Sequence, residues 1–472
     1  MVFSSIIFLF FFLPLTLGLY YIMVRKYRNM ALLFSSLIFY LWGGGWFLCV
    51  LIVSTLIDYT FGLILGRAEG WKRHLWLSCS VLLNISLLAY FKYANFFVSE
   101  FNRGASHLGI ESIRWSTVIL PIGISFFTFH KISYIVDIYR GTCKALRSLV
   151  DFALYIILFP QLIAGPIVRF HEISEQLKNR TETLEGFYHG VLRLSLGLVK
   201  KVMLANNCGE IADAIFALNI SSLDTKTAWI GIFAYTLQIY FDFSGYSDMA
   251  IGLGLMFGFK LPENFNRPYS AVSITDFWRR WHISLSNFLR DYLYIPLGGS
   301  RCNTAQTYLN LMIIFVVCGL WHGANWTFVV WGGYHGFLLM IERITGLRQL
   351  EESAHVFLRR MVTFLLVMVG WVFFRSADFK QAAGYLSAMF FPMDNPLPLQ
   401  IIVILNTRNI VFLLIAASVV FFKRDFAAIN LLIVEKKPVM TVVTLSVLLI
   451  LVLYSVTCIA SGSYNPFLYF QF

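Results

Sequence analysis

The sequence predicts an all-α, polytopic membrane protein, for two reasons. Of its 472 residues, 58% are hydrophobic and only 13% are charged, whereas soluble domains carry roughly 25% charged residues. The apolar residues also gather in runs that are bounded by basic clusters, which is typical of membrane-spanning helices. A water-soluble fold could not bury so many apolar side chains, so the lipid bilayer is the expected environment.

The first predicted span is Val2–Val24, which has about the twenty residues that a crossing needs. It lacks a basic region before it and a small-residue cleavage site after it, so we interpret it as a retained helix. A helical hairpin is predicted next, with its turn at Gly43–Gly45, and further spans are predicted near His74–Val98 and Trp115–Val136. Basic clusters follow every second crossing, which puts the N-terminus outside and these clusters in the cytoplasm.

The stretch Asp151–Arg169 departs from this pattern. Pro160 and the pair Gly165-Pro166 interrupt its apolar run, and basic residues flank it on both sides. A broken backbone at membrane depth is tolerated only where protein or water satisfies its polar groups. We therefore expect a re-entrant segment that enters and leaves on one side.

The rest of the chain contains seven further predicted spans. They are Phe187–Ala205, Trp229–Phe259, Tyr308–Leu320, Trp326–Ile341, Arg360–Phe374, Ile410–Phe422 and Val439–Ala460. The chain thus has about 11 or 12 crossings, with the C-terminus outside. No repeat or soluble domain stands out, so residues 1–472 are interpreted as one membrane domain.

The charge and the cysteines exclude several classes of protein. The net charge is +12, but in a membrane protein basic residues gather in cytoplasmic loops and meet anionic lipid, so nucleic acid is not an expected partner. The seven cysteines are scattered singly with no CxxC spacing. This spacing argues against a zinc site and against a disulfide framework, and we expect no bound metal.

The most polar island between the spans is Asp276–Ser286. It combines Arg279, Arg280 and His282 with aromatic residues, and an apolar face formed by Phe277, Trp281, Leu285, Phe288 and Leu289 fits a single interfacial helix on the cytoplasmic side. A helix that only anchors the protein in lipid is one interpretation. The cationic cluster favours another, in which Arg279 and Arg280 bind an anionic cytosolic ligand such as a nucleotide-bearing thioester.

A second island, Gly319–Trp326, places His322 within very apolar sequence. The apolar segments on either side of it are short, and Gly319, Gly323 and Asn325 permit a break between two helices near mid-depth. A neutral imidazole at such a break can act as a general base toward a hydroxyl. The alternative is a buried histidine that only satisfies a hydrogen bond, as we expect for His335 among its glycines.

Two carboxylates, Asp242 and Asp248, also lie in apolar sequence. They are six residues apart and do not share a helix face, so structural pairing is favoured over paired-carboxylate chemistry. A transporter or flippase that uses His322 and Asp242 as a proton relay is the rival class of function. A scaffold for polysaccharide synthesis is a third interpretation.

Several blocks of the chain resemble a known family, in the family's order. They are Phe159–Ile167, Tyr240–Ala250, Asn264–Tyr269, Asp276–Gly299 and Gly319–Gly336. The chain resembles the membrane-bound O-acyltransferases of bacteria, in the branch that holds the alginate O-acetyltransferase and the D-alanyl transfer protein of teichoic acids. The segments Met1–Ser5 and Phe91–Phe96 point more closely to the alginate acetylation branch.

The resemblance implies a fold and a site. The fold is a ring of tilted helices around a thin centre, with re-entrant segments and cytosolic interfacial helices. His322 matches the family's catalytic histidine, and His282 matches its second, supporting polar position, which is Asn in many family members.

The resemblance also implies a reaction and its partners. The acyl donor is acetyl-CoA, used as a substrate with no bound cofactor, and the location is the bacterial inner membrane. The acetyl group passes across the membrane to a periplasmic Ser-His-Asp partner of the SGNH type and then to an exopolysaccharide made by the synthesis machinery. Alginate is the first expectation, whereas cellulose or peptidoglycan would need only a different periplasmic partner.

Overall fold

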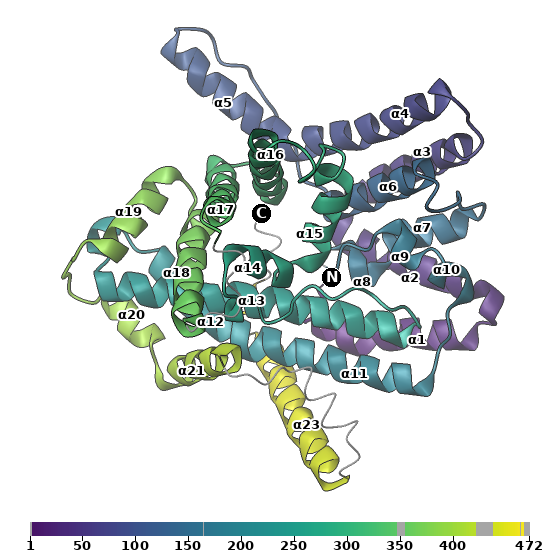
Figure 1. Ribbon diagram of the computed structural model, residues 1–472. Coiled ribbons are helices and arrows are strands. Elements are labelled where there is room, and N and C mark those ends of the chain that lie inside the picture. Colours follow the sequence, from purple (N-terminus) through teal and green to yellow (C-terminus); the bar gives the residue numbers. More distant parts are fainter. Residues whose placement is uncertain (1, 164, 347–354, 422–437, 463, 467–472) are drawn as a thin grey trace. The chain divides into compact units, whose positions relative to one another are not determined.

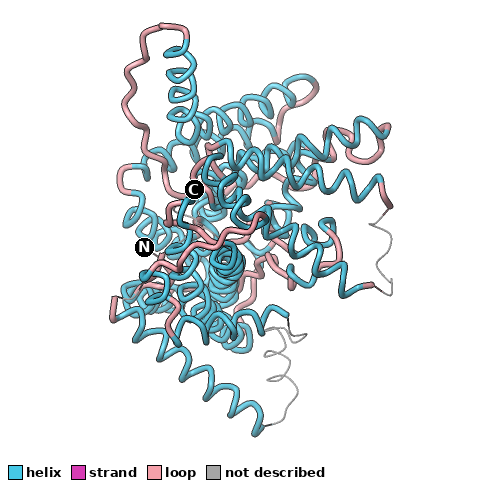
Figure 2. Tube along the Cα trace, turned by 90° about the vertical axis from the view of Figure 1, so that its left-hand side faces the viewer, coloured by secondary structure: helices cyan, strands magenta, loops and turns pink. Residues whose placement is uncertain are grey.

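The computed structural model of the protein describes residues 2–163, 165–346, 355–421, 438–462 and 464–466. It is 76% helical, and its described residues contain no β-strand (Figure 2). Five of the described helical segments are long and apolar enough to cross a membrane: Phe47–Leu65, Trp71–His107, Thr304–His322, Val356–Arg375 and Thr441–Ala460. The predicted fold class, an all-α polytopic membrane protein, is confirmed. The number of crossings and the sides of the termini stay predictions.

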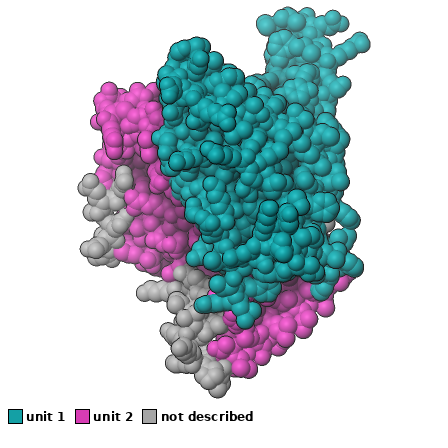
Figure 3. Space-filling view, turned by 90° about the vertical axis from the view of Figure 1, so that its right-hand side faces the viewer, with its two compact units in different colours: residues 1–187, 253–262 teal, residues 188–252, 263–472 magenta. Residues whose placement is uncertain are grey.

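The chain packs into two compact units, which are coloured separately in Figure 3. The first comprises residues 1–187 and 253–262, and the second comprises residues 188–252 and 263–472. The helices α11 (Leu184–Val199) and α13 (Thr225–Met256) each carry the chain from one unit into the other. The assignment of one membrane domain to residues 1–472 stays a prediction.

The first unit contains the N-terminal helices. Its main helices are α1 (Leu13–Ile22), α2 (Arg28–Gly44), α3 (Phe47–Leu65), α4 (Trp71–Leu88), α5 (Ala94–His107) and α6 (Ile124–Tyr139), followed by the short α7 (Leu149–Ile157), α8 (Phe159–Leu162), α9 (Phe170–Ile173) and α10 (Gln176–Asn179). The predicted hairpin turn is confirmed, because α2 ends at Gly44 and Gly45 has a φ of 53°. The predicted interruption after Asp151 is also confirmed as a break between α7 and α8.

The span predicted over Trp115–Val136 is wrong in its first half. Helix α6 begins only at Ile124, and residues 110–121 form no helix. The physical reason is Pro121, which disfavours helix in the residue before it, together with Gly123 at a φ of 75°. The side chain of Asn95 replaces the missing helical hydrogen bonds, since its amide bonds both the N–H and the C=O of Val118 at 2.9 and 2.8 Å.

The second unit contains the helices that carry the predicted site. They are α12 (Asn206–Phe216), α14 (Ile274–Arg280), α15 (Ile283–Leu289), α16 (Thr304–His322), α17 (Trp326–Ile344), α18 (Val356–Arg375), α19 (Phe379–Phe390), α20 (Leu399–Ile404), α21 (Thr407–Phe421) and α23 (Pro438–Ala460) (Figure 1). The spans predicted from Phe187 onward fall on helices, except that Trp229–Phe259 runs three residues past the end of α13 at Met256. Phe422, the last residue of the predicted span Ile410–Phe422, lies outside the described residues.

Candidate functional site

The break predicted around His322 is confirmed. Helix α16 ends at His322, Gly323 is extended, and α17 starts at Trp326. The side chain of Asn325 caps α17 by accepting a hydrogen bond from the backbone N–H of Thr327 at 3.1 Å. Its amide N–H₂ donates to the carbonyl of Ala377 at 2.7 Å, which fixes the turn against the end of α18. Asn325 is therefore a structural residue of the turn.

The two helices are longer than the sequence predicts. Each contains 19 residues, which at 1.5 Å per residue is about 28 Å, close to the thickness of the hydrocarbon core. The reason is that α16 starts in polar sequence, where the Asn303 side chain caps it by accepting from Gln306 N at 2.8 Å. His322 thus lies at the end of a 19-residue helix, and the predicted short segments are wrong in length. The depth of the break in the membrane stays a prediction.

Two glycines allow α16 and α17 to pack at very short range. A Cβ on Gly319 would lie 2.1 Å from the carbonyl oxygen of Phe328, and a Cβ on Gly332 would lie 2.1 Å from that of Phe315. These neighbours are backbone atoms, so they cannot rotate away. The close packing makes the hairpin of α16 and α17 (Figure 1) a rigid support for His322.

Aromatic rings surround the imidazole of His322. The rings of Trp321, Trp331 and Phe374 lie with centroids 4.9, 5.2 and 5.2 Å away. The residue itself is half-buried. The ring of His282 also lies within reach, with a centroid separation of 6.5 Å. The structure therefore brings together the two histidines that the sequence singles out, although they are forty residues apart in the chain.

His282 sits at a chain break that the sequence does not reveal. The single interfacial helix predicted across Phe277–Leu289 is wrong, because α14 ends at Arg280, α15 begins at Ile283, and His282 has a left-handed φ of 44°. The non-helical segment Asn264–Asn266 lies beside this break and stabilises it through two backbone hydrogen bonds. Asn266 N donates to Arg280 O, and Ile283 N donates to Asn264 O. Such a strained conformation in a non-glycine residue costs free energy, and it clusters at functional sites.

The imidazole of His282 is fully buried. It packs against Phe243, with a centroid separation of 4.6 Å, and against Trp321 at 6.1 Å. Burial lowers the pKa of His282 to about 3, because the charged imidazolium would lose its hydration. His282 therefore stays neutral at physiological pH, which suits a supporting hydrogen-bonding group better than a cation.

The two candidate donor-binding arginines lie at the end of α14. Arg279 is exposed, whereas Arg280 forms an ion pair with Asp276, from Nε to Oδ1, at 2.7 Å. An anionic ligand would have to compete with Asp276 for Arg280. The two arginines are separated from His282 by Trp281 alone, so they belong to the same part of the second unit.

A polar cavity of about 350 Å³ lies in the second unit, with Ile283, the neighbour of His282, in its wall. Its charged lining residues are Arg193, Lys200, Asp248, Glu263 and Arg267. Asp248 binds Arg193 at 2.7 Å and Lys200 at 2.6 Å, and Arg193 also binds Glu263 at 2.5 Å. The structural pairing predicted for Asp248 is confirmed. The lining contains three cationic side chains and two carboxylates, so the cavity is cationic by one charge.

The remaining singled-out residues have structural partners. Asp242 pairs with Lys201 at 2.5 Å, and both side chains are buried. His335 is fully buried and accepts a hydrogen bond of 3.4 Å from the indole N–H of Trp278 on α14. The predicted pairing of Asp242 is confirmed, and the structural role of His335 stays a prediction. Among the described residues, no cluster of His, Cys, Asp or Glu has the arrangement that would hold a metal ion.

Sequence reasoning missed Glu342 on α17. Its carboxylate accepts hydrogen bonds from the backbone N–H groups of Ile274 and Thr275, the latter at 2.9 Å, and from the Thr275 hydroxyl at 2.8 Å. These contacts tie the first turn of α14 to α17, where a negative charge also complements the helix dipole. Helix α17 thus contacts His322 through Trp331, and it contacts the two ends of α14 through His335 and Glu342. A lone acidic residue near a helix end gave no signal for this role.

We expect Glu342→Ala to loosen α14 and with it the chain break at His282. The buried N–H of Ile274 and the part-buried N–H of Thr275 would lose their acceptor, and an unsatisfied buried group costs about 1–3 kcal/mol. The variant should unfold at a lower temperature than the wild type in detergent and should lose activity in proportion. Thr345→Ala, which alters an exposed residue of the same helix end, is the control. Equal unfolding temperatures for wild type and Glu342→Ala would contradict the proposed tie.

Comparison with known proteins identifies the class to which this site belongs. The family model of MBOAT, the membrane-bound O-acyltransferase family, matches residues 144–374. The chain is 46% identical to the probable alginate O-acetylase AlgI of Pseudomonas putida over the full length of both chains. It is 51% identical to the probable alginate O-acetylase AlgI of Azotobacter vinelandii, covering 83% of this chain and 78% of that one. It is 38% identical to the peptidoglycan O-acetyltransferase of Helicobacter pylori, covering 82% and 80%.

The chain belongs to the membrane-bound O-acyltransferase family. It is accordingly a multi-pass membrane enzyme of the O-acyltransferase class. The matched residues 144–374 include His282, His322, Arg279, Arg280 and the walls of the polar cavity up to Ile283. The family favours the acyltransferase interpretation over a proton-coupled transporter, a flippase or a scaffold.

Proposed function

We propose that this protein O-acetylates an exopolysaccharide, alginate in the first place, from its position in the bacterial inner membrane. The acetyl donor is cytosolic acetyl-CoA, and the acceptor side involves a periplasmic SGNH-type acetyltransferase and the polysaccharide synthesis machinery. The observation that carries the proposal is the pairing of His322 with His282 at 6.5 Å, in a chain 46% identical over its whole length to a probable alginate O-acetylase.

The chemistry assigned to His322 is general-base catalysis. The imidazole takes the proton from the acceptor hydroxyl as the oxygen attacks the carbonyl carbon of the thioester. The tetrahedral intermediate then collapses, the C–S bond breaks, and the CoA thiolate leaves and takes up the proton. His282 supports this step from its buried, neutral position beside His322. The aromatic wall of Trp321, Trp331 and Phe374 limits the orientations of the His322 ring.

A second candidate acceptor is peptidoglycan. The observation that favours it is the 38% identity to the peptidoglycan O-acetyltransferase of Helicobacter pylori over 82% of the chain. Cellulose acetylation would use the same chemistry. Deletion of the gene separates the three acceptors, because the ester should disappear from one polymer alone. NMR of purified alginate, cellulose and peptidoglycan before and after deletion identifies the polymer that loses its acetyl ester. Unchanged acetylation of all three polymers would refute the proposed function.

Arg279 gives a direct test of the donor side. We expect Arg279→Glu to raise the KM for acetyl-CoA by about 10- to 100-fold with a smaller effect on kcat, since a hydrogen bond to a charged group contributes about 1.5–3 kcal/mol. Arg301→Glu is the matched control, because Arg301 is also exposed and basic but lies outside the proposed cluster. Equal KM values for the two variants would indicate a general charge effect and would remove Arg279 from the donor site.

A further inference from the structure

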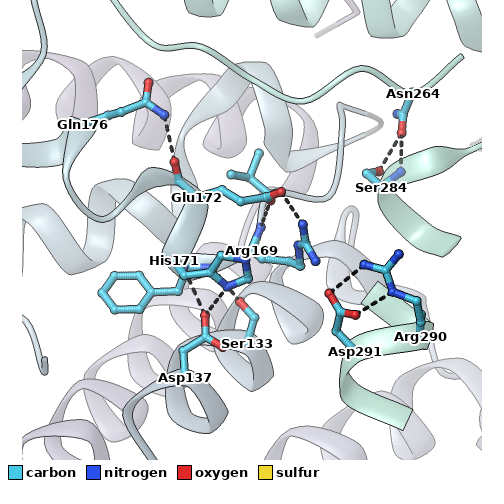
Figure 4. A network of polar contacts seen from close by, with 12 residues as sticks. Ser133, Asp137, Arg169, His171, Glu172, Gln176, Asn264, Ser284, Arg290 and Asp291 are labelled. Atoms are coloured by element: carbon cyan, nitrogen blue, oxygen red, sulfur yellow. Dashed lines mark hydrogen bonds and ion pairs between the residues drawn. The ribbon is translucent and has the colours of Figure 1, made fainter. Parts of the chain in front are cut away.

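The fold fixes the side-chain carbonyl oxygen of Asn264. Its carbonyl oxygen accepts hydrogen bonds from the Ser284 hydroxyl at 2.6 Å and from the Ser284 backbone N–H at 3.3 Å (Figure 4). A backbone N–H can only donate, so the oxygen of the amide must face Ser284. The amide N–H₂ of Asn264 therefore points away from Ser284, and its orientation is determined.

The other end of the same amide lacks a partner. Asn264 is only 1% exposed, and its Nδ2 has no hydrogen-bond partner among the described residues of the chain. A buried, unsatisfied donor is costly, and in a native protein it calls for a specific explanation. Asn264 also lines the polar cavity of about 350 Å³. A ligand in this cavity with a hydrogen-bond acceptor would supply the missing partner.

Asn264 is joined to the histidine pair through the backbone. The backbone carbonyl of Asn264 accepts a hydrogen bond of 3.0 Å from the backbone N–H of Ile283, the residue that follows His282. The imidazole of His282 in turn lies 6.5 Å from that of His322, measured between ring centroids. The cavity wall at Asn264 is therefore bonded to the residue next to His282, whereas His282 and His322 are not themselves among the residues that line the cavity.

Two of the other strong donors of the cavity, Arg193 and Lys200, are already engaged by carboxylates. Arg193 binds both Asp248 and Glu263, and Lys200 binds Asp248. A neutral amide donor that is held in place before the substrate arrives needs no reorganisation when negative charge develops. This makes the Asn264 amide the best-prepared donor for a neutral group that becomes negative during the reaction.

We propose that the Nδ2–H of Asn264 donates a hydrogen bond to the carbonyl oxygen of the transferred acetyl group, and that Asn264 is thus a catalytic residue. This inference rests on the proposed function. As the acceptor oxygen bonds to the carbonyl carbon, the π pair of the C=O bond moves to its oxygen, and the proton of the acceptor hydroxyl moves to His322. Asn264 stabilises the resulting oxyanion. When the C=O bond forms again, the C–S bond breaks and the thiolate takes the proton.

The decisive variant is Asn264→Asp, which keeps an oxygen acceptor for Ser284 but removes the N–H₂ donor. We expect its kcat for acetyl transfer to fall by about 10²- to 10³-fold, as for the loss of one oxyanion donor, with little change in KM. Ser284→Ala is the matched control, because it removes a hydroxyl partner of Asn264 but keeps both the amide donor and the Ser284 backbone N–H. Its kcat should stay within about tenfold of the wild type.

A second variant covers the case in which Asn264→Asp does not fold. The double variant Asn264→Leu/Ser284→Ala replaces both side-chain partners by apolar groups, which is tolerated better than the loss of one partner. It should show the same fall in kcat. A folded variant of either kind with wild-type kcat, or with a raised KM and an unchanged kcat, overturns the assignment of Asn264. Unchanged acetylation of alginate, cellulose and peptidoglycan after deletion of the gene, by contrast, refutes the proposed function itself.

Discussion

We expect His322→Ala to abolish polymer acetylation while leaving the amount of protein and its membrane insertion near normal. This is the expected result if the imidazole is the base that activates the acceptor hydroxyl, because removal of a general base lowers a rate by about 10²- to 10⁴-fold. His322 is half-buried at the end of α16, so its side chain can be removed without opening a sealed core. Acetyl content, expression level and gel-filtration profile should be measured on the same sample.

The matched control for this experiment is His335→Ala. His335 is fully buried on α17, where it accepts a hydrogen bond from Trp278, so its loss should act through stability. Its variant should show a lower unfolding temperature together with reduced activity. A well-folded His322→Ala protein that acetylates polymer at the wild-type rate would contradict the role of His322 as the base. If His282→Ala acetylates polymer and His322→Ala does not, His282 has only a supporting role in the reaction.

Gly332→Ala should be among the most damaging small substitutions outside the histidine pair, together with Gly319→Ala. The added Cβ would lie 2.1 Å from the backbone oxygen of Phe315, so α16 and α17 would have to move apart. Overpacking of this kind costs about 1–3 kcal/mol. A displacement of about 1 Å at the end of α16 would also misplace His322 and could lower the rate by about 10²-fold. Thermal unfolding in detergent and acetyl transfer together measure both effects.

Gly333 provides the control within the same sequence. It is adjacent to Gly332 on α17, yet a Cβ at this position would meet nothing within 4 Å. Gly333→Ala should therefore be neutral or slightly stabilising, since Ala favours a helix over Gly. Similar losses in both variants would show that helix flexibility, and not the close packing of α16 on α17, governs the activity.

The parts of the fold that depend on local sequence could be predicted. The turn after Gly44 and the break after His322 both follow from residues adjacent in the chain, namely glycines and, for the break, the capping side chain of Asn325. The pairing of Asp248 also followed from a general rule, because a carboxylate in apolar sequence needs a cationic partner. In each case a few neighbouring residues carry the information.

The features that depend on distant partners could not be predicted. The chain break at His282 exists because Asn264 and Asn266 bond the backbone on either side of it, and the apolar spacing of the segment suggested one continuous helix. In the same way, Asn95 stabilises the non-helical chain at Val118 from a different helix. Periodicity in one segment carries no information about such contacts, so local pattern and tertiary structure disagree there.

The central claim is that the protein consumes a thioester donor at a centre that requires His322. The most direct measurement is the release of CoA from radiolabelled acetyl-CoA by the purified, detergent-solubilised protein. Wild-type protein should transfer or hydrolyse the acetyl group, and His322→Ala at the same concentration should release CoA at least about 10²-fold more slowly. A wild-type protein that leaves acetyl-CoA intact, or a His322→Ala protein that consumes it equally fast, would contradict this account.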